Sequence, residues 1–263
     1  MQTLTVLFIG DIVGRPGRRA VRTEVPILKR THGVDLVIAN VENAAGGFGV
    51  TASVVEELRA SGIDLMTTGN HVWDKRESYD LIDETPFLLR PLNYPPGVPG
   101  RGSLVYQGDG WRLGLVNLSG RVFLPGFDDP FRAISALLQT DFGNADLILV
   151  DFHAEATAEK VALGWYLDGK VAAVVGTHTH IQTADARILP EGTAYITDVG
   201  MTGPLNSVLG MDRAIIINKF LTQMPARFEV ASGPYTFQGV VITFDLTNRR
   251  AVSIERIFTN EPE

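Results

Sequence analysis

The chain contains the stretch Val171-Ala172-Ala173-Val174-Val175-Gly176-Thr177-His178-Thr179-His180, in which a short apolar run leads directly into two histidines. A short apolar run bounded by glycine is typical of a buried β-strand. Two other histidine blocks follow similar runs, Gly69-Asn70-His71 and Asp151-Phe152-His153. Two further runs end in Gly10-Asp11 and in Asn40-Val41-Glu42-Asn43. Five predicted strands therefore end in polar side chains.

These five strand ends supply the donor atoms that a two-metal site needs. Imidazole nitrogen suits Fe, Zn, Mn or Co, and a carboxylate can bridge two cations. Sites in α/β proteins form where the strands end at their carboxyl side. A single block of this kind is most simply a buried histidine with a hydrogen-bond partner, but all five together predict a metal centre.

The rest of the chain alternates apolar runs with helical periodicity. Strands are predicted at Leu4–Ile9, Val34–Ala39, Ile63–Thr67, Leu147–Val150 and Val171–Val175. An antiparallel hairpin is predicted where Ser103–Gln107 and Trp111–Leu118 flank Gly108-Asp109-Gly110, and later strands at Thr193–Thr197, Phe237–Phe244 and Ala251–Ile257. These patterns predict an α/β fold of two mixed sheets packed face to face with helices outside. We expect a single domain over residues 1–263, because most connections are short.

Four helices are predicted between these strands. One starts near Pro16, one after a capping box at Ser53–Glu56, and one lies around Pro130–Gln139. The fourth would place Ala158, Val161, Ala162 and Trp165 on its buried face.

Composition excludes several classes of function. The net charge is −7, whereas a surface that coats nucleic acid needs a basic face. The chain has no cysteine, which excludes disulfides, thiolate zinc sites and cysteine nucleophiles and fits a cytoplasmic protein. The first apolar run, Leu4–Ile9, is too short to span a membrane. We expect a cytoplasmic protein without a membrane segment or an extended nucleic-acid surface, and a homo-oligomer is compatible with the sequence.

The ordered set of blocks resembles the calcineurin-like metallophosphoesterase superfamily, and more closely its YmdB-like branch. The matching segments span most of the chain. They are Gly10-Asp11-Ile12-Val13-Gly14, Asn40 to Gly47, Gly69-Asn70-His71-Val72-Trp73, His153 to Lys160, and Gly176 to Asp185. A lone Gly-Asn-His triplet is a weak signal, but the whole ordered set is specific. The resemblance implies a four-layer arrangement in which helices cover two packed sheets.

Three positions depart from the broader superfamily pattern. The histidine usually found two residues after the first aspartate is Val13, the bridging aspartate is Glu42, and the acidic residue after Gly-Asn-His is Val72. Asn43 is the nearest residue that could replace a missing ligand. The YmdB-like branch shares these departures, so they favour that branch over protein phosphatases.

The resemblance implies a role for each residue of the site. It implies two transition-metal ions, with iron or manganese preferred and zinc or cobalt compatible. One ion would be bound by Asp11, Glu42, Asn43 and His180, and the other by Glu42, Asn70, His153 and His178. Glu42 would bridge the two ions. His71 lies outside both sets and would protonate the leaving oxygen as a general acid.

The implied reaction is the hydrolysis of a small cyclic nucleotide of the 2′,3′-cyclic AMP type. A hydroxide bridging the metals would attack phosphorus, and a small phosphodiester would be the partner. Two alternatives stay open: a phosphomonoesterase with the same metals, and a regulatory nucleotide-binding protein with little turnover.

Some polar residues have weaker assignments. Arg15 could contact the substrate phosphate, although a solvated helix face explains it as well. Trp73 is either a stacking surface for a base or a core residue. Asp74, Asp151 and Asp185 are expected to orient ligand histidines. The fifth histidine, His32, lies near the end of a predicted helix and needs no role in the site.

Overall fold

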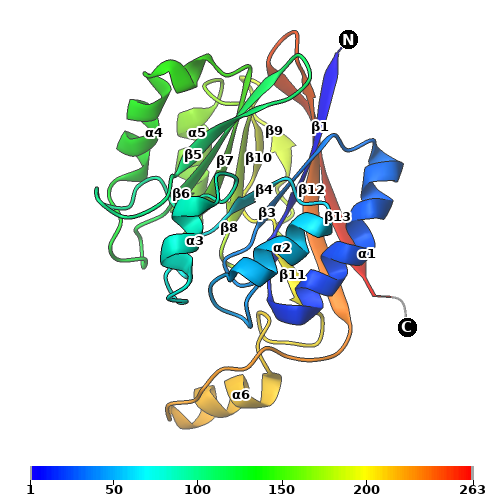
Figure 1. The fold of residues 1–263 in the computed structure, drawn as a ribbon, viewed down its shortest axis with the longest axis vertical. Helices are drawn as coiled ribbons and strands as arrows, with labels where there is room; N and C mark the ends of the chain where they lie inside the picture. Colours follow the sequence, from blue (N-terminus) through cyan, green and yellow to red (C-terminus); the bar gives the residue numbers. More distant parts are fainter. Residues whose placement is uncertain (1, 262–263) are drawn as a thin grey trace.

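The computed structural model describes residues 2–261, which form two mixed β-sheets packed against each other with helices on their outer sides (Figure 1). The first sheet has the order β2-β11-β12-β1-β3-β4, and β13 pairs with β12 as well. Its strands are β1 (Thr3–Ile9), β2 (Asp11–Ile12), β3 (Leu36–Asn40), β4 (Leu65–Thr67), β11 (Met201–Pro204), β12 (Tyr235–Asp245) and β13 (Arg250–Asn260). Strands β1, β3 and β4 run parallel, so their carboxyl ends lie at one edge of this sheet.

The second sheet has the order β5-β6-β7-β8-β10-β9. Its strands are β5 (Ser103–Gln107), β6 (Arg112–Ser119), β7 (Leu147–His153), β8 (Ala173–Thr177), β9 (Arg187–Ile188) and β10 (Ala194–Ile196). Strands β6, β7, β8 and β10 are parallel, whereas β5 and β9 pair antiparallel at the two edges. Both sheets are therefore mixed, as predicted.

The helices form the outer layers. They are α1 (Gly14–His32), α2 (Ala52–Ala60), α3 (Ser78–Glu84), α4 (Pro130–Leu138), α5 (Thr157–Leu167) and α6 (Arg213–Thr222), with a 3₁₀ turn at Asp141–Asn144. One apolar core joins α1, α2 and α3 to the first sheet, and another joins α4 and α5 to the second. A third core lies between the sheets, where Phe8 and Ile38 pack with Leu115 and Leu149. The predicted four-layer fold is confirmed.

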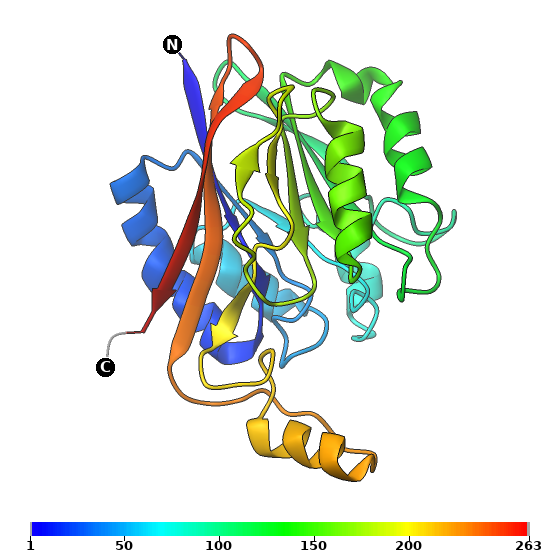
Figure 2. The ribbon, with the colours of Figure 1, turned by 180° about the vertical axis from the view of Figure 1, so that it is seen from behind.

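Helix α6 is the exception to this layering. It projects from one end of the molecule, away from both sheets, and its connections lead back to β11 and β12 (Figures 1 and 2). The sequence patterns did not predict this helix, because its run of three isoleucines has no clear amphipathic period. Within residues 2–261, no helix is both long and apolar enough to cross a bilayer.

Two details of the predicted helices are wrong. Helix α2 begins at Ala52 after Thr51 and has no side-chain cap, so Ser53 and Glu56 do not form a capping box. In α5 the buried residues are Glu159, Lys160, Leu163, Gly164 and Leu167, while Trp165 is half exposed. The polar members of this face are buried because they have partners. The Glu159 carboxylate accepts hydrogen bonds from the backbone N–H groups of Arg121 and Val122.

Candidate metal centre

The structure brings the seven predicted metal ligands together at the carboxyl ends of strands from both sheets. Asp11 follows β1, His153 ends β7, and the other ligands lie in the loops after β3, β4 and β8. The loop residues are Glu42, Asn43, Asn70, His178 and His180. Parallel strands deliver these side chains to one edge, as the sequence pattern predicts.

Three donor atoms converge on one nitrogen of His153. The Nε2 atom lies 3.0 Å from Asn70 Oδ1, 3.0 Å from Glu42 Oε1 and 3.0 Å from His178 Nδ1. A ring nitrogen carries at most one proton and cannot satisfy three such neighbours. A cation would bind all of these lone pairs, so the donor set fits a metal ion. Glu42, His153 and His178 form the carboxylate–histidine group with ligand atoms within 4.8 Å of one another.

Asp11 provides a second sign of a cation. Its side chain is fully buried, and Oδ2 accepts a hydrogen bond of 3.0 Å from the backbone N–H of His178. Its other oxygen, Oδ1, has no hydrogen-bond partner among the described residues. It faces His153 Nδ1 at 3.9 Å and His180 Nε2 at 4.0 Å. A buried carboxylate oxygen without a partner is costly, and metal coordination would remove that cost.

Gly69 leaves space at the centre of the cluster. A Cβ atom at this position would collide with the ring of His153 and with Glu42 Oε2. The same segment donates the backbone N–H of His71 to Glu42 Oε2 over 3.0 Å. The glycine of the Gly-Asn-His block therefore lets the β4 loop approach the donor atoms closely.

The two histidines after β8 are held through their second ring nitrogens. His180 Nδ1 lies 3.0 Å from the carbonyl oxygen of Leu209, and His178 Nε2 lies 3.0 Å from Glu155 Oε2. These bonds leave His180 Nε2 and His178 Nδ1 directed at the cluster. Such partners fix the ring orientation of metal-binding histidines. Glu155 lies in a matched motif but was not predicted to have a role.

The backbone of this loop is strained, and a buried ion pair supports it. His178 and His180 have φ angles of 103° and 64°, in a region that side chains rarely adopt. Between them, the N–H and Oγ1 of Thr179 donate to Asp198 Oδ2 over 3.0 and 2.8 Å. The same oxygen accepts from Lys160 Nζ over 2.6 Å, and this amine also donates to the Thr177 carbonyl oxygen. Neither Lys160 nor Asp198 was predicted from the sequence as a supporting residue.

A further hydrogen-bond network lies beneath His153. His153 Nδ1 lies 2.9 Å from Thr177 Oγ1, which in turn donates to Asp151 Oδ1 over 2.7 Å. Asp151 also accepts from Asn40 Nδ2 over 3.1 Å. Burial raises the pKa of Asp151 to about 7. The predicted partnership between Asp151 and a histidine thus exists, but it passes through a threonine hydroxyl.

The charged groups of the cluster shift each other's pKa. Burial opposes ionisation of Glu42, but the adjacent His153 outweighs it and lowers the pKa of Glu42 to about 2. Burial likewise opposes protonation of His153, but Glu42 outweighs it and raises the pKa of His153 to about 9. Burial and the charge of His153 lower the pKa of His178 to about 3. The cluster therefore favours one positive charge among these donors, which is the role that a bound cation would fill.

His71 lies beside this cluster. Its Nδ1 is 2.8 Å from Asp74 Oδ2, so Asp74 contacts the proposed acid and not, as had been predicted for it, one of the proposed ligand histidines. Its ring packs edge-on against Phe48 at a centroid distance of 5.0 Å, and about a third of the side chain is exposed. The His71 ring is therefore held by Asp74 and Phe48 and is also accessible to solvent.

Three residues with weaker assignments do not line the pocket over the cluster. Arg15 is exposed in the first turn of α1 and does not line the pocket over the cluster. Trp73 packs against the core of the first sheet and against the rings of Tyr79 and Tyr94. Asp185 accepts from Thr183 and Thr197 rather than from a histidine. The expected contact between Asp185 and a ligand histidine is therefore wrong.

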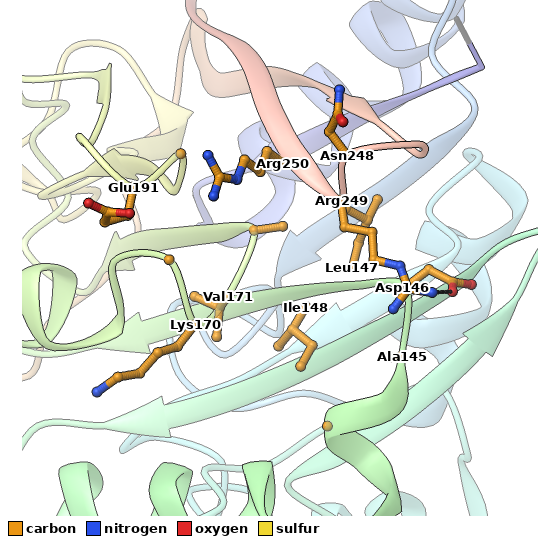
Figure 3. Close-up of a pocket in the computed structure, with 14 residues that line it drawn as sticks. Ala145, Asp146, Leu147, Ile148, Lys170, Val171, Glu191, Asn248, Arg249 and Arg250 are labelled. Atoms are coloured by element: carbon orange, nitrogen blue, oxygen red, sulfur yellow. Dashed lines mark ion pairs between the residues drawn. The ribbon is translucent and has the colours of Figure 1, made fainter.

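A pocket of about 270 Å³ opens over the cluster. Its walls carry predicted ligands together with Gly47, Phe48, His71, Glu155, Leu209 and Met211. A second cavity, of about 240 Å³, lies at the amino ends of β7 and β8 (Figure 3). There, Asp146 pairs with Arg249 at 3.2 Å, and none of the predicted site residues lines the cavity.

Comparisons with known proteins agree with this geometry. The family model described as YmdB-like protein matches residues 7–257. A 2′,3′-cyclic-nucleotide 2′-phosphodiesterase from Bacillus subtilis (strain 168) is 53% identical over 258 residues, which cover 98% of each chain.

Solved structures show the same similarity. A protein from Thermus thermophilus is 45% identical with a TM-score of 0.92, over 98% of this chain and 100% of that one. A phosphatase from Mycoplasma pneumoniae is 35% identical with a TM-score of 0.94, over 99% of this chain and 95% of that one.

Proposed function

The chain belongs to the YmdB-like protein family, and we propose that it is a metal-dependent phosphodiesterase that hydrolyses small cyclic nucleotides of the 2′,3′-cyclic AMP type. The observation that carries the proposal is the convergence of unshared electron pairs around His153 Nε2 and Asp11 Oδ1. The Bacillus subtilis relative, similar over almost the whole chain, supplies the substrate class.

The donor atoms support two cation positions that share Glu42. The first would use Asp11, Glu42, Asn43 and His180, and the second Glu42, Asn70, His153 and His178. Glu42 suits the shared position because its two oxygens face different parts of the cluster, towards His153 and towards the His71 backbone. Asn43 Nδ2 lies 3.2 Å from His180 Nε2. Exchanging the oxygen and nitrogen of this amide would present an oxygen donor at the first position.

Nitrogen and oxygen donors without thiolate suit iron, manganese, zinc or cobalt, and we propose iron or manganese. Bound at this site, two such cations would lower the pKa of a water molecule and neutralise charge on the phosphoryl oxygens. The protein's own residues supply the remaining functions. The carboxylates and imidazoles would hold the cations, and the buried hydrogen-bond networks would hold these side chains in place.

His71 is the proposed general acid. Its contact with Asp74 holds the ring in the wall of the pocket, where the ring can deliver a proton to the departing sugar oxygen. None of the proposed ligand sets requires this side chain, so it is free to carry a proton.

We further propose that residues 1–263 act as one domain in the cytoplasm, with a small phosphodiester as the partner. The core shared by both sheets supports a single folding unit. An assembly of identical chains is compatible with this proposal.

The experiment that tests the function combines metal analysis with a substrate panel. Protein purified without chelators is expected to contain about two transition-metal ions per chain. It should hydrolyse 2′,3′-cyclic nucleotides faster than linear phosphomonoesters. A preference for monoesters would favour a phosphomonoesterase, and tight nucleotide binding with negligible turnover would favour a regulatory protein.

A further inference from the structure

A third cavity, which is almost entirely apolar, adjoins the pocket over the candidate metal centre. Its volume is about 480 Å³, within the range of small-molecule sites. Its lining residues are Phe48, Val208, Leu209, Met211, Ile216, Lys219, Phe220 and Phe228. Phe48, Leu209 and Met211 line the metal-centre pocket as well. The two cavities therefore share a wall.

This apolar cavity is built from the projecting part of the molecule. Ile216 and Phe220 come from α6, which stands clear of both sheets (Figure 2). The side chain of Phe220 is 74% exposed, although it lies on the rim of a cavity. Exposed aromatic side chains around a concave surface are typical of a ligand site rather than of a folded core.

The shared wall is attached to the proposed catalytic groups. The Phe48 ring packs against His71, and the carbonyl oxygen of Leu209 accepts a hydrogen bond from His180 Nδ1. A group lodged in the apolar cavity would thus contact two residues that themselves contact the proposed acid and one proposed metal ligand.

We propose that this cavity binds the nucleobase of the substrate, an inference that rests on the proposed function. In a ribonucleoside 2′,3′-cyclic phosphate, the base is attached to the sugar carbon adjacent to the one that bears the 2′ oxygen. A phosphate at the candidate metal centre would therefore hold its base close by, and the shared wall of Phe48, Leu209 and Met211 offers that base an apolar surface. Aromatic rings bind the face of any base by stacking.

The lining also predicts the specificity of this subsite. Its aromatic residues are phenylalanines, which offer no hydrogen-bond donor or acceptor to a base edge. The exposed amine of Lys219 is the polar side-chain group in the lining, and it lies 4.5 Å from the centre of the Phe228 ring. The cavity should therefore accept all four bases and favour purines through their larger stacking area.

The test compares two cyclic phosphodiesters that differ in the base. One is 2′,3′-cyclic AMP, and the other is glycerol 1,2-cyclic phosphate, which has the same five-membered phosphate ring and no base. The readout is kcat/KM for 2′,3′-cyclic AMP divided by kcat/KM for glycerol 1,2-cyclic phosphate. Phe220→Ala is expected to lower this ratio roughly 5- to 100-fold, mainly through KM for the nucleotide, as loss of one stacking contact does. Phe220→Trp should restore it.

The matched control is Leu221→Ala on the same helix. Leu221 is 79% exposed and does not line the cavity, so the ratio should stay at the value of the unmodified protein. An unchanged ratio in Phe220→Ala would overturn the base subsite. A change in oligomeric state on gel filtration in Phe220→Ala, with the ratio unchanged, would overturn it in favour of an interface between copies. Failure of the unmodified protein to hydrolyse either substrate would instead contradict the proposed function.

Discussion

The two cavities at opposite ends of β7 and β8 have similar volumes, about 270 and 240 Å³, but their charged groups are arranged differently. At the carboxyl ends, Asp11 and His153 are fully buried, and one carboxylate oxygen has no partner among the described residues. At the amino ends, Asp146 pairs with Arg112 and Arg249, whose side chains are about half exposed. What distinguishes the candidate metal centre is a set of buried lone pairs that converge with too few hydrogen-bond donors to satisfy them. The volume of the cavity does not distinguish it.

Among variants that keep their metal, the largest change in activity is expected from His71→Ala. Loss of a positioned general acid should reduce turnover of 2′,3′-cyclic AMP roughly 10²- to 10⁴-fold. A nitrophenyl phosphodiester should lose less, because its leaving group departs with little protonation. His32→Ala serves as the control, since His32 lies at the end of α1. The metal content of His71→Ala should stay nearly intact, and a loss of metal as in His153→Ala would show that His71 is a ligand.

The next largest effect should come from the buried ion pair beneath the centre. Lys160→Met leaves Asp198 buried without its cation, which typically costs about 3–5 kcal/mol of unfolding free energy. Chemical denaturation would measure this loss. Adding Asp198→Asn to the same chain removes the unpaired charge and should recover part of the stability. If the double variant is no more stable than Lys160→Met, the charge is not what destabilises the protein.

Asp185 is intermediate in burial between the charged groups at the two ends of the strands, and it is held by hydrogen bonds. Burial raises its pKa, but bonds from Thr183 and Thr197 outweigh burial and hold that pKa below the ordinary value. Its contribution is therefore complete above the ordinary aspartate pKa of about 3.9 and is lost as pH falls through the folded value. Asp185→Asn should cost about 1 kcal/mol or less at pH 7, measured by denaturation. This difference should shrink below about pH 4, and a constant difference would contradict the assignment.

The smallest effect is expected at the amino ends of the strands. Arg249→Asn removes the ion pair with Asp146, and asparagine tolerates the positive φ of 55° at this position. An exposed pair of this kind is worth about 0.2–1 kcal/mol, and less at high salt. A loss of unfolding free energy above about 2 kcal/mol would contradict the view that this ion pair is exposed and screened by solvent.

The convergence of the candidate ligands was largely predictable because these residues follow strand ends. Asp11, Asn70 and His178 lie far apart in the sequence, but parallel strands bring their carboxyl ends to one edge. Supporting residues were not predictable by the same logic. Lys160 reads as a surface residue until Asp198, 38 positions later, is known to lie opposite its amine.

The projecting position of α6 was equally hidden from the sequence. Its apolar residues lie on a helix that projects from the sheets rather than packing on them, so periodicity offered no core-facing stripe to recognise. Arg15 lies near Asp11 in the sequence and is exposed in the first turn of α1, but it does not line the pocket, so its contact with the substrate phosphate stays a prediction.

The most direct test of the account is metal analysis of two matched carboxylate-to-amide variants. Glu42→Gln alters the proposed shared ligand, and Asp146→Asn makes the same chemical change at the other end of the strands. Circular dichroism would confirm that both variants fold. The account predicts about two ions per chain in the unmodified protein and in Asp146→Asn, with most of the metal lost from both positions in Glu42→Gln. Full metal content in Glu42→Gln, or equal losses in the two variants, would contradict it.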